Sequence, residues 1–361
     1  RLLVVVVVEV RVDLQRHLAT RLSRGRRARE SVQVLRSLLG SVARSADVIA
    51  ERSGHAMGCG SSKPVADGPT KKSANFSGKG IDKFPDVPKD TEEIDLSENE
   101  SLTDLAGVGA LTALEKLDSN ACMLTKVPDE IESCASLEEL LLYKNKIKEC
   151  SAKIGALTNL TTLNLFNNQL KKLPPEVGKL TKLEEVNVAA NKMMMLTDAH
   201  FTSWASVKIL SLYDNNLVRM GSLAPCTGLE ELRISGNNLE EMPALSSHTA
   251  LTTYEIHKNR IASVPDDYFT ATPALQRLSI WGNQLTGALP ASLMSCGQLV
   301  GVQAHENQLT SVPAGAWPST LETLFLGPQS GGGTFTLAPE LGALTKLKRV
   351  NLGKLALDDA D

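Results

Sequence analysis

From residue 91 onward, apolar and polar positions follow a pattern that returns every 22 to 24 residues. Each unit reads apolar, two variable residues, apolar, one variable, apolar, two variable, asparagine, one variable, apolar. The pattern is plain in LEELLLYKNKI (137–147), LTTLNLFNNQL (160–170) and LEELRISGNNL (229–239). Its alternating core predicts a short strand with one apolar face. One unit cannot cover that face alone, so we expect the units to stack.

The asparagine position recurs through the whole pattern. It is occupied by Asn99, Asn145, Asn168, Asn191, Asn215, Asn237, Asn259, Asn283 and Asn307, and by Cys122 and Gln329 in two further units. Ten successive intervals of nearly equal length make a chance repetition implausible. The pattern resembles that of the leucine-rich repeat family over about 265 residues.

This resemblance implies an α/β fold, a solenoid of about 11–12 repeats. A curved parallel β-sheet would form its concave side, with short helices and loops on the convex side. In this family the asparagine side chain bonds backbone groups of the turn, which would make the asparagines above a structural ladder. Cysteine suits this position because a thiol is small and donates a weak hydrogen bond.

The segments between strands resemble those of intracellular Ras-suppressor and plant intracellular Ras-group-related repeats. Examples are VPDEIESCASL (127–137) and LPPEVGKLTKL (173–183), where proline can begin a short helix. The cysteines are spread through the repeats and do not cluster at either end. That distribution favours a reducing compartment, and we expect a cytoplasmic protein.

The first 56 residues differ in composition from the rest. They contain eleven arginines, no lysine and five acidic residues, whereas the whole chain of 361 residues has 38 basic and 41 acidic side chains. Two interpretations fit this Arg-rich leader. It is a mitochondrial transit peptide, or it is translated upstream sequence and the working protein starts at Met57. We favour the second interpretation because of the residues that follow.

Met57 opens the sequence MGCGSSKP. N-myristoylation requires a glycine exposed by removal of the initiator methionine, with Ser or Thr four residues further on, and Gly58 and Ser62 meet this spacing. Cys59 is a natural palmitoylation site, and two acyl chains anchor a protein stably where one does not. If translation begins upstream, Gly58 has no free amine and the segment is a linker. We therefore expect three regions: the leader (1–56), the acylation motif with a flexible linker (57–90), and the repeat domain (91–361).

No constellation of catalytic or metal-binding residues emerges from the sequence. The chain has no CxxC, HExxH or GxSxG motif, and the loop GPQSGGGT (327–334) lacks the lysine of a phosphate-binding loop. The net charge of −3 disfavours a nucleic-acid partner. We expect no enzymatic activity, no cofactor and no metal.

One column of surface positions is enriched in rings. The residue after the third apolar position points toward the concave face, and across ten repeats this column holds four of the chain's few aromatic residues and two histidines: Tyr143, Phe166, Tyr213, His257, Trp281 and His305. Rings in a row provide large, rigid contact area for a protein partner. The alternative is that they pack on one another for stability.

These features predict a non-enzymatic adaptor or scaffold in intracellular signalling. It would bind another protein through the concave face, and the membrane through its acylated terminus if Met57 is the start. Two alternatives remain: a regulatory subunit of an enzyme such as a protein phosphatase, and a mitochondrial repeat protein if the leader is a transit peptide.

Overall fold

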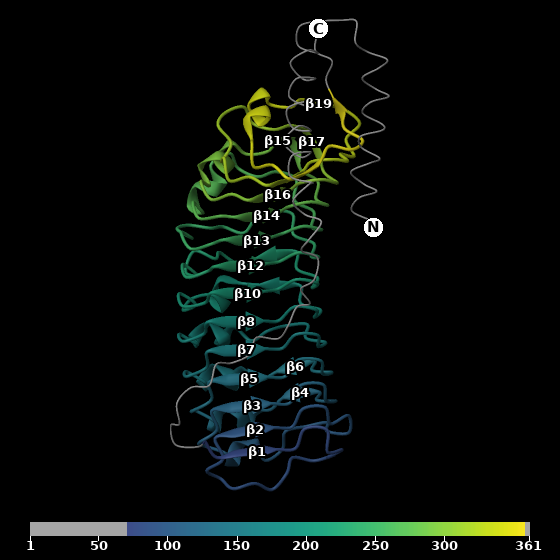
Figure 1. Cartoon of the computed structure of the whole chain (residues 1–361). Coiled ribbons are helices and arrows are strands. Elements are labelled where there is room, and N and C mark those ends of the chain that lie inside the picture. Colours follow the sequence, from purple (N-terminus) through teal and green to yellow (C-terminus); the bar gives the residue numbers. More distant parts are fainter. Residues whose placement is uncertain (1–70, 358–361) are drawn as a thin grey trace, which may run out of the picture. The chain divides into compact units, whose positions relative to one another are not determined.

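The computed structural model describes residues 71–357. The Arg-rich leader and the candidate acylation residues Gly58 and Cys59 lie outside the described residues. The described chain divides into two compact units at residue 260. In both units short parallel strands stack as successive rungs (Figure 1).

The first unit, residues 71–260, contains one main parallel sheet in the order β1-β2-β3-β5-β7-β8-β10-β12-β13. Its strands are β1 (Ser73–Asn75), β2 (Glu93–Asp95), β3 (Lys116–Asp118), β5 (Glu139–Leu141), β7 (Thr162–Asn164), β8 (Glu185–Asn187), β10 (Ile209–Ser211), β12 (Glu231–Arg233) and β13 (Thr253–Glu255). Two small parallel pairs lie beside it: β4 (Lys126–Val127) with β6 (Glu149–Cys150), and β9 (Met195–Leu196) with β11 (Arg219–Met220).

The second unit, from residue 261, repeats this design. Its main strands are β14 (Arg277–Ser279), β16 (Gly301–Gln303), β18 (Thr323–Phe325) and β20 (Arg349–Asn351), each paired in parallel with the next. The small pairs are β15 (Thr286–Ala288) with β17 (Gln308–Ser311), and β19 (Thr334–Phe335) with β21 (Ala356–Leu357).

Short 3-10 helices lie between the strands. They are η1 (Val108–Ala110), η2 (Asp129–Ser133), η3 (Ala152–Ala156), η4 (Pro175–Lys179) and η5 (Asp198–His200) in the first unit, and η6 (Tyr268–Ala271), η7 (Ala291–Ser295) and η8 (Pro339–Ala343) in the second. The expected short helices are thus of the 3-10 type throughout residues 71–357. At three to five residues each they are too short for the hydrogen bonding of a stable α-helix.

The apolar positions of the repeat form the core, as the pattern predicts. Leu140 and Leu142 of one repeat and Leu163 and Leu165 of the next are fully buried. Trp204 is buried with them, and its Nε1 donates a hydrogen bond to the carbonyl oxygen of Val177 at 3.0 Å. No helix among residues 71–357 is both long enough and apolar enough to cross a membrane.

The sheet begins earlier than the leucine pattern. Strand β1 falls within residues 57–90, which the composition led us to expect as a flexible linker. Its sequence, Ser-Ala-Asn, carries no leucine, and it joins the sheet through its backbone. The N–H of Phe76 continues this pairing by donating to the carbonyl oxygen of Asp95 at 2.7 Å.

Candidate functional site

Most strands of the main sheet leave it through the same tight turn; after β18 Pro328 precedes the ladder position and does not have the left-handed backbone. The residue before the asparagine adopts a left-handed backbone, for example Lys144 at φ 56°, Ala190 at φ 52° and Gly236 at φ 64°. The asparagine is buried, and its amide group bonds the turn from inside. The turn therefore holds the last residues of each strand in fixed positions on the sheet surface.

The asparagine ladder links each repeat to the one before it. The Nδ2 group of Asn168 donates to the carbonyl oxygens of Leu142 (2.9 Å) and Leu165 (3.1 Å). Its Oδ1 accepts the N–H of Ile147 at 2.9 Å. The other candidate ladder residues are also buried and bonded to backbone groups: Asn99, Asn145, Asn191, Asn215, Asn237, Asn259, Asn283 and Asn307.

Two substituted ladder positions keep part of this bonding. Gln329 donates to the carbonyl oxygen of Ala304 at 3.0 Å and accepts the N–H of Leu309 at 3.1 Å. The thiol of Cys122 donates to the carbonyl oxygen of Leu96 at 3.2 Å. The same repeat places Ser119 at a core position, where its hydroxyl is buried and has no hydrogen-bond partner among the described residues.

The side of the main sheet opposite the leucine core is here called the sheet surface. Strand residues alternate between the two sides, so the residues flanking each buried central position face this surface. In the first unit it carries Tyr143, Phe166, Tyr213 and His257, all half-buried. These are the positions that the sequence assigned to the concave face.

Two of these rings meet across an intervening strand. Phe166 and Tyr213 belong to rungs that are separated by the rung of Ala189, yet their ring centroids are 6.0 Å apart and tilted by 45°. Two rung spacings amount to about 9.6 Å, so the rings lean toward each other. Ala189 is fully buried, and its small side chain leaves the room that this approach requires.

In the second unit the sheet surface carries a compact ring cluster. Trp281 and His305 stack with centroids 5.0 Å apart and an interplanar angle of 9°, and Phe325 meets His305 edge-on at 6.4 Å. The Nδ1 atom of His305 is buried and has no hydrogen-bond partner among the described residues, and burial lowers the pKa of the imidazole. Phe325 was not a candidate because it stands one surface position earlier in its repeat than the other rings.

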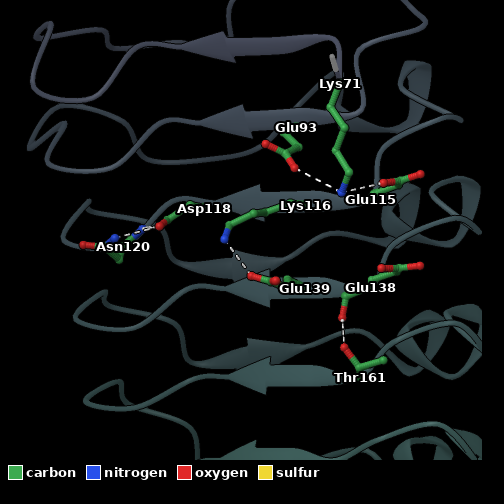
Figure 2. Close-up of polar contacts among 9 residues, drawn as sticks. All are labelled: Lys71, Glu93, Glu115, Lys116, Asp118, Asn120, Glu138, Glu139 and Thr161. Atoms are coloured by element: carbon green, nitrogen blue, oxygen red, sulfur yellow. Dashed lines mark hydrogen bonds and ion pairs between the residues drawn. The ribbon is translucent and has the colours of Figure 1, made fainter. Parts of the chain in front are cut away.

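Charged side chains gather on the strands at the start of the first unit (Figure 2). The Nζ atom of Lys71 forms ion pairs with the carboxylates of Glu93 and Glu115, and the Nζ atom of Lys116 lies 2.7 Å from Oε2 of Glu139. Hydrogen bonds to Glu115 and then to Glu93 raise the pKa of Lys71. These lysines are therefore charged at neutral pH, and carboxylates still outnumber them on these strands.

Among residues 71–357 the buried cysteines are not activated as nucleophiles, and no metal centre is formed. Burial raises the pKa of the Cys226 thiol to about 12 and that of Cys134 to about 11, so both are protonated at neutral pH. Within the part of the chain that the structure describes, no group of three or more histidine, cysteine, aspartate or glutamate side chains could hold a metal ion.

Comparisons with protein families give several matches in the repeat region. Family models described as leucine-rich repeats match residues 135–175, 158–194, 181–239 and 274–296. A search of the curated proteins finds no significant match.

Solved structures share the fold at low sequence identity. InlJ from Listeria monocytogenes is 17% identical with a TM-score of 0.54, over 75% of this chain and 64% of that one. YopM from Yersinia enterocolitica is 23% identical with a TM-score of 0.53, over 77% of this chain and 52% of that one. PEPR1, solved with AtPEP1, is 20% identical with a TM-score of 0.53, over 72% of this chain and 43% of that one. The matches thus span less than two thirds of each of these longer chains.

Proposed function

The chain belongs to the leucine-rich repeat proteins, whose fold generally serves as a scaffold for protein–protein interaction, and from this membership we propose that it is a non-enzymatic adaptor. It binds another protein through the sheet surface, the concave face of the solenoid. The half-buried rings on this surface act as anchors of the interface.

The contact between Phe166 and Tyr213 carries this proposal. Aromatic rings held against each other lose little further freedom on binding and offer a large contact area, as the anchor residues of protein interfaces do. Polar side chains such as Asn164 and Arg233 lie on the strands beside them. A ring cluster with a mixed polar surround suits a protein partner.

The adaptor acts in the cytoplasm, in signalling, and is held at the membrane if Met57 is the start of translation. Myristoylation of Gly58 with palmitoylation of Cys59 supplies the two acyl chains that stable anchoring requires. The dispersed cysteines and their protonated thiols support a reducing compartment.

The test compares partner capture with stability. The variant Tyr213→Ala/Trp281→Ala removes one ring from each unit, and Tyr268→Ala, a ring on helix η6, is the matched control. We expect the double variant to weaken the captured complex by about 2 kcal/mol or more. By contrast Leu212→Ala, in the core, should cost about 2–5 kcal/mol of folding free energy.

Affinity is measured on the purified partner, and stability by chemical denaturation of each variant. If the double variant binds the partner as wild type does but unfolds as readily as Leu212→Ala, the rings are structural and the proposal is wrong. Equal losses of affinity in Tyr268→Ala would likewise contradict an interface on the sheet surface.

A further inference from the structure

Three glutamates stand on adjacent rungs at the start of the first unit. Glu92, Glu115 and Glu138 each precede a strand, and the N–H of Glu115 and of Glu138 donates at 2.7 Å to the carbonyl oxygen of the glutamate one rung earlier. Neighbouring rungs are about 4.8 Å apart. These backbone bonds stack the three glutamates on successive rungs, so their charges add to the negative potential where the strands begin.

Lysines neutralise only part of this charge. The strands β2, β3 and β5 and the residue before each of them supply seven carboxylates. Two lysines, Lys71 and Lys116, pair with carboxylates of this group (Figure 2). Five negative charges are left in excess. No lysine or arginine within residues 71–357 forms an ion pair with Asp95 or Asp118.

The backbone hydrogen bond of the turn does not require the charges of Asp95 and Asp118. Each accepts, at Oδ1, the backbone N–H two residues later, at 2.9 and 3.1 Å. Asn164 and Asn187 hold the same place in β7 and β8 and accept the same bond at 3.1 and 3.2 Å. A neutral amide therefore accepts the same backbone bond. The two carboxylates also accept side-chain bonds: Asp95 from Ser97 Oγ at 2.6 Å and from Asn75 Nδ2 at 3.2 Å, and Asp118 from Asn120 Nδ2 at 2.6 Å.

The two charges also act against folding. Asp95 and Asp118 are directly paired in the register of β2 and β3, and like charges in that arrangement are destabilising. Burial, with a further contribution from Asp95, raises the pKa of Asp118. The bonds that the two carboxylates accept come from neutral donors, so their negative charges are not neutralised and are available to a cation from outside.

Aromatic rings continue the charged surface. Tyr143 follows Glu139 on the rung of β5, and Phe166 occupies the next rung, where its carbonyl oxygen accepts the N–H of Lys144 at 2.8 Å. A guanidinium group pairs with carboxylates and also stacks on aromatic faces, whereas an ammonium is a compact point charge. Carboxylates beside rings therefore favour arginine.

We propose that the β2–β5 end of the sheet surface binds an arginine-containing basic segment of the partner protein, with Asp95 and Asp118 recognising its charge. This rests on the proposed function and names the chemistry of the partner. Charge complementarity selects a basic segment and repels polyanions such as nucleic acid.

The experiment measures binding of a fluorescein-labelled Arg-Arg-Ser repeat peptide to the full chain by fluorescence anisotropy. Asp95→Asn/Asp118→Asn removes two charges and keeps the turn bond. Glu130→Gln/Glu149→Gln removes two exposed charges away from the sheet surface and is the matched control. We expect the aspartate pair to weaken peptide binding about tenfold and to reduce its salt dependence, with the control within about twofold of wild type. The unfolding midpoint of the aspartate variant should stay close to that of wild type, because the asparagines keep the backbone bond of the turn and lose the repulsion between the two charges.

Three results would overturn the inference. Equal weakening in the two charge variants would mean that only net charge matters. A lower unfolding midpoint in Asp95→Asn/Asp118→Asn would make the charges structural. The third result concerns the variant Arg24→Gln/Arg26→Gln/Arg27→Gln, which removes three arginines of the leader. If this variant binds the peptide severalfold more tightly than wild type, the leader itself competes for the acidic surface and is its occupant.

The purified partner separates this inference from the proposed function. A complex weakened by both Tyr213→Ala/Trp281→Ala and the aspartate variant supports both. If the ring variant weakens the complex and the aspartate variant does not, the adaptor function is supported and the inference of a basic partner segment is refuted.

Discussion

Truncating one ladder asparagine tests how the repeats are joined. In Asn168→Ala the carbonyl oxygens of Leu142 and Leu165 each lose one donor, but they keep another, because Asn145 donates to the first at 3.0 Å and Asn191 to the second at 2.9 Å. The N–H of Ile147 loses the oxygen that it meets at 2.9 Å.

The cost follows from that single N–H group. Ile147 is fully buried, so its N–H would be left without a partner in the protein interior. An unsatisfied buried donor costs about 1–3 kcal/mol, and we expect a loss of about 2 kcal/mol in the free energy of unfolding. At a urea dependence of about 3 kcal/mol/M the midpoint should fall by about 0.7 M.

Urea denaturation followed by circular dichroism measures this shift. Asn216→Ala is the control, because Asn216 is exposed and directly follows the ladder residue Asn215. A midpoint for Asn168→Ala that equals the control would show that the Ile147 N–H does not depend on the ladder, and the reasoning would be refuted.

Four further outcomes are expected. Ser119→Ala removes a buried hydroxyl without a partner and should raise the unfolding midpoint; a lower midpoint would contradict the unpaired hydroxyl. Ala190→Gly removes the strain of an alanine with a left-handed backbone, and it should raise the free energy of unfolding, measured by thermal denaturation, by about 0.5–1 kcal/mol. Burial lowers the pKa of His248 below 6.5, so the unfolded chain binds more protons, and stability should fall as the pH drops below about 6.5; His248→Gln should reduce this slope in midpoints taken from pH 7.5 to 5.5. If Met57 starts translation, Gly58→Ala should move the protein from the membrane pellet to the supernatant, and Cys59→Ser should leave weak, reversible binding.

The repeat pattern was sufficient to predict the fold and the core. The leucines specify which side of each strand is buried, and the asparagines mark where each strand ends. The left-handed turn residue carried no such signal, because Lys144, Ala190 and Asp214 occupy it as well as Gly236. The surrounding bonds impose that backbone on lysine, alanine and aspartate alike.

The surface contacts were harder to predict. Counting positions placed Phe166 and Tyr213 in one column, but two rungs apart, and only the small Ala189 between them lets the rings touch. Phe325 joined the ring cluster of the second unit from a different column. Contacts of this kind depend on side-chain volume between rungs, which a repeat pattern does not encode.

The ladder also gives the first unit a direction. The Oδ1 atom of Asn145 accepts the N–H of Leu124, that of Asn168 accepts the N–H of Ile147, and that of Asn237 accepts the N–H of Leu217. Each of these N–H groups belongs to the preceding repeat, so a repeat obtains this acceptor from its successor and never from its own asparagine. A repeat added at the C-terminal side therefore satisfies its predecessor, and a chain cut after Leu217 leaves that N–H orphaned at the new end. Such a stack therefore grows and frays in one direction. The last repeat at the C-terminal side always has one N–H group without its asparagine acceptor, and the next repeat supplies that acceptor.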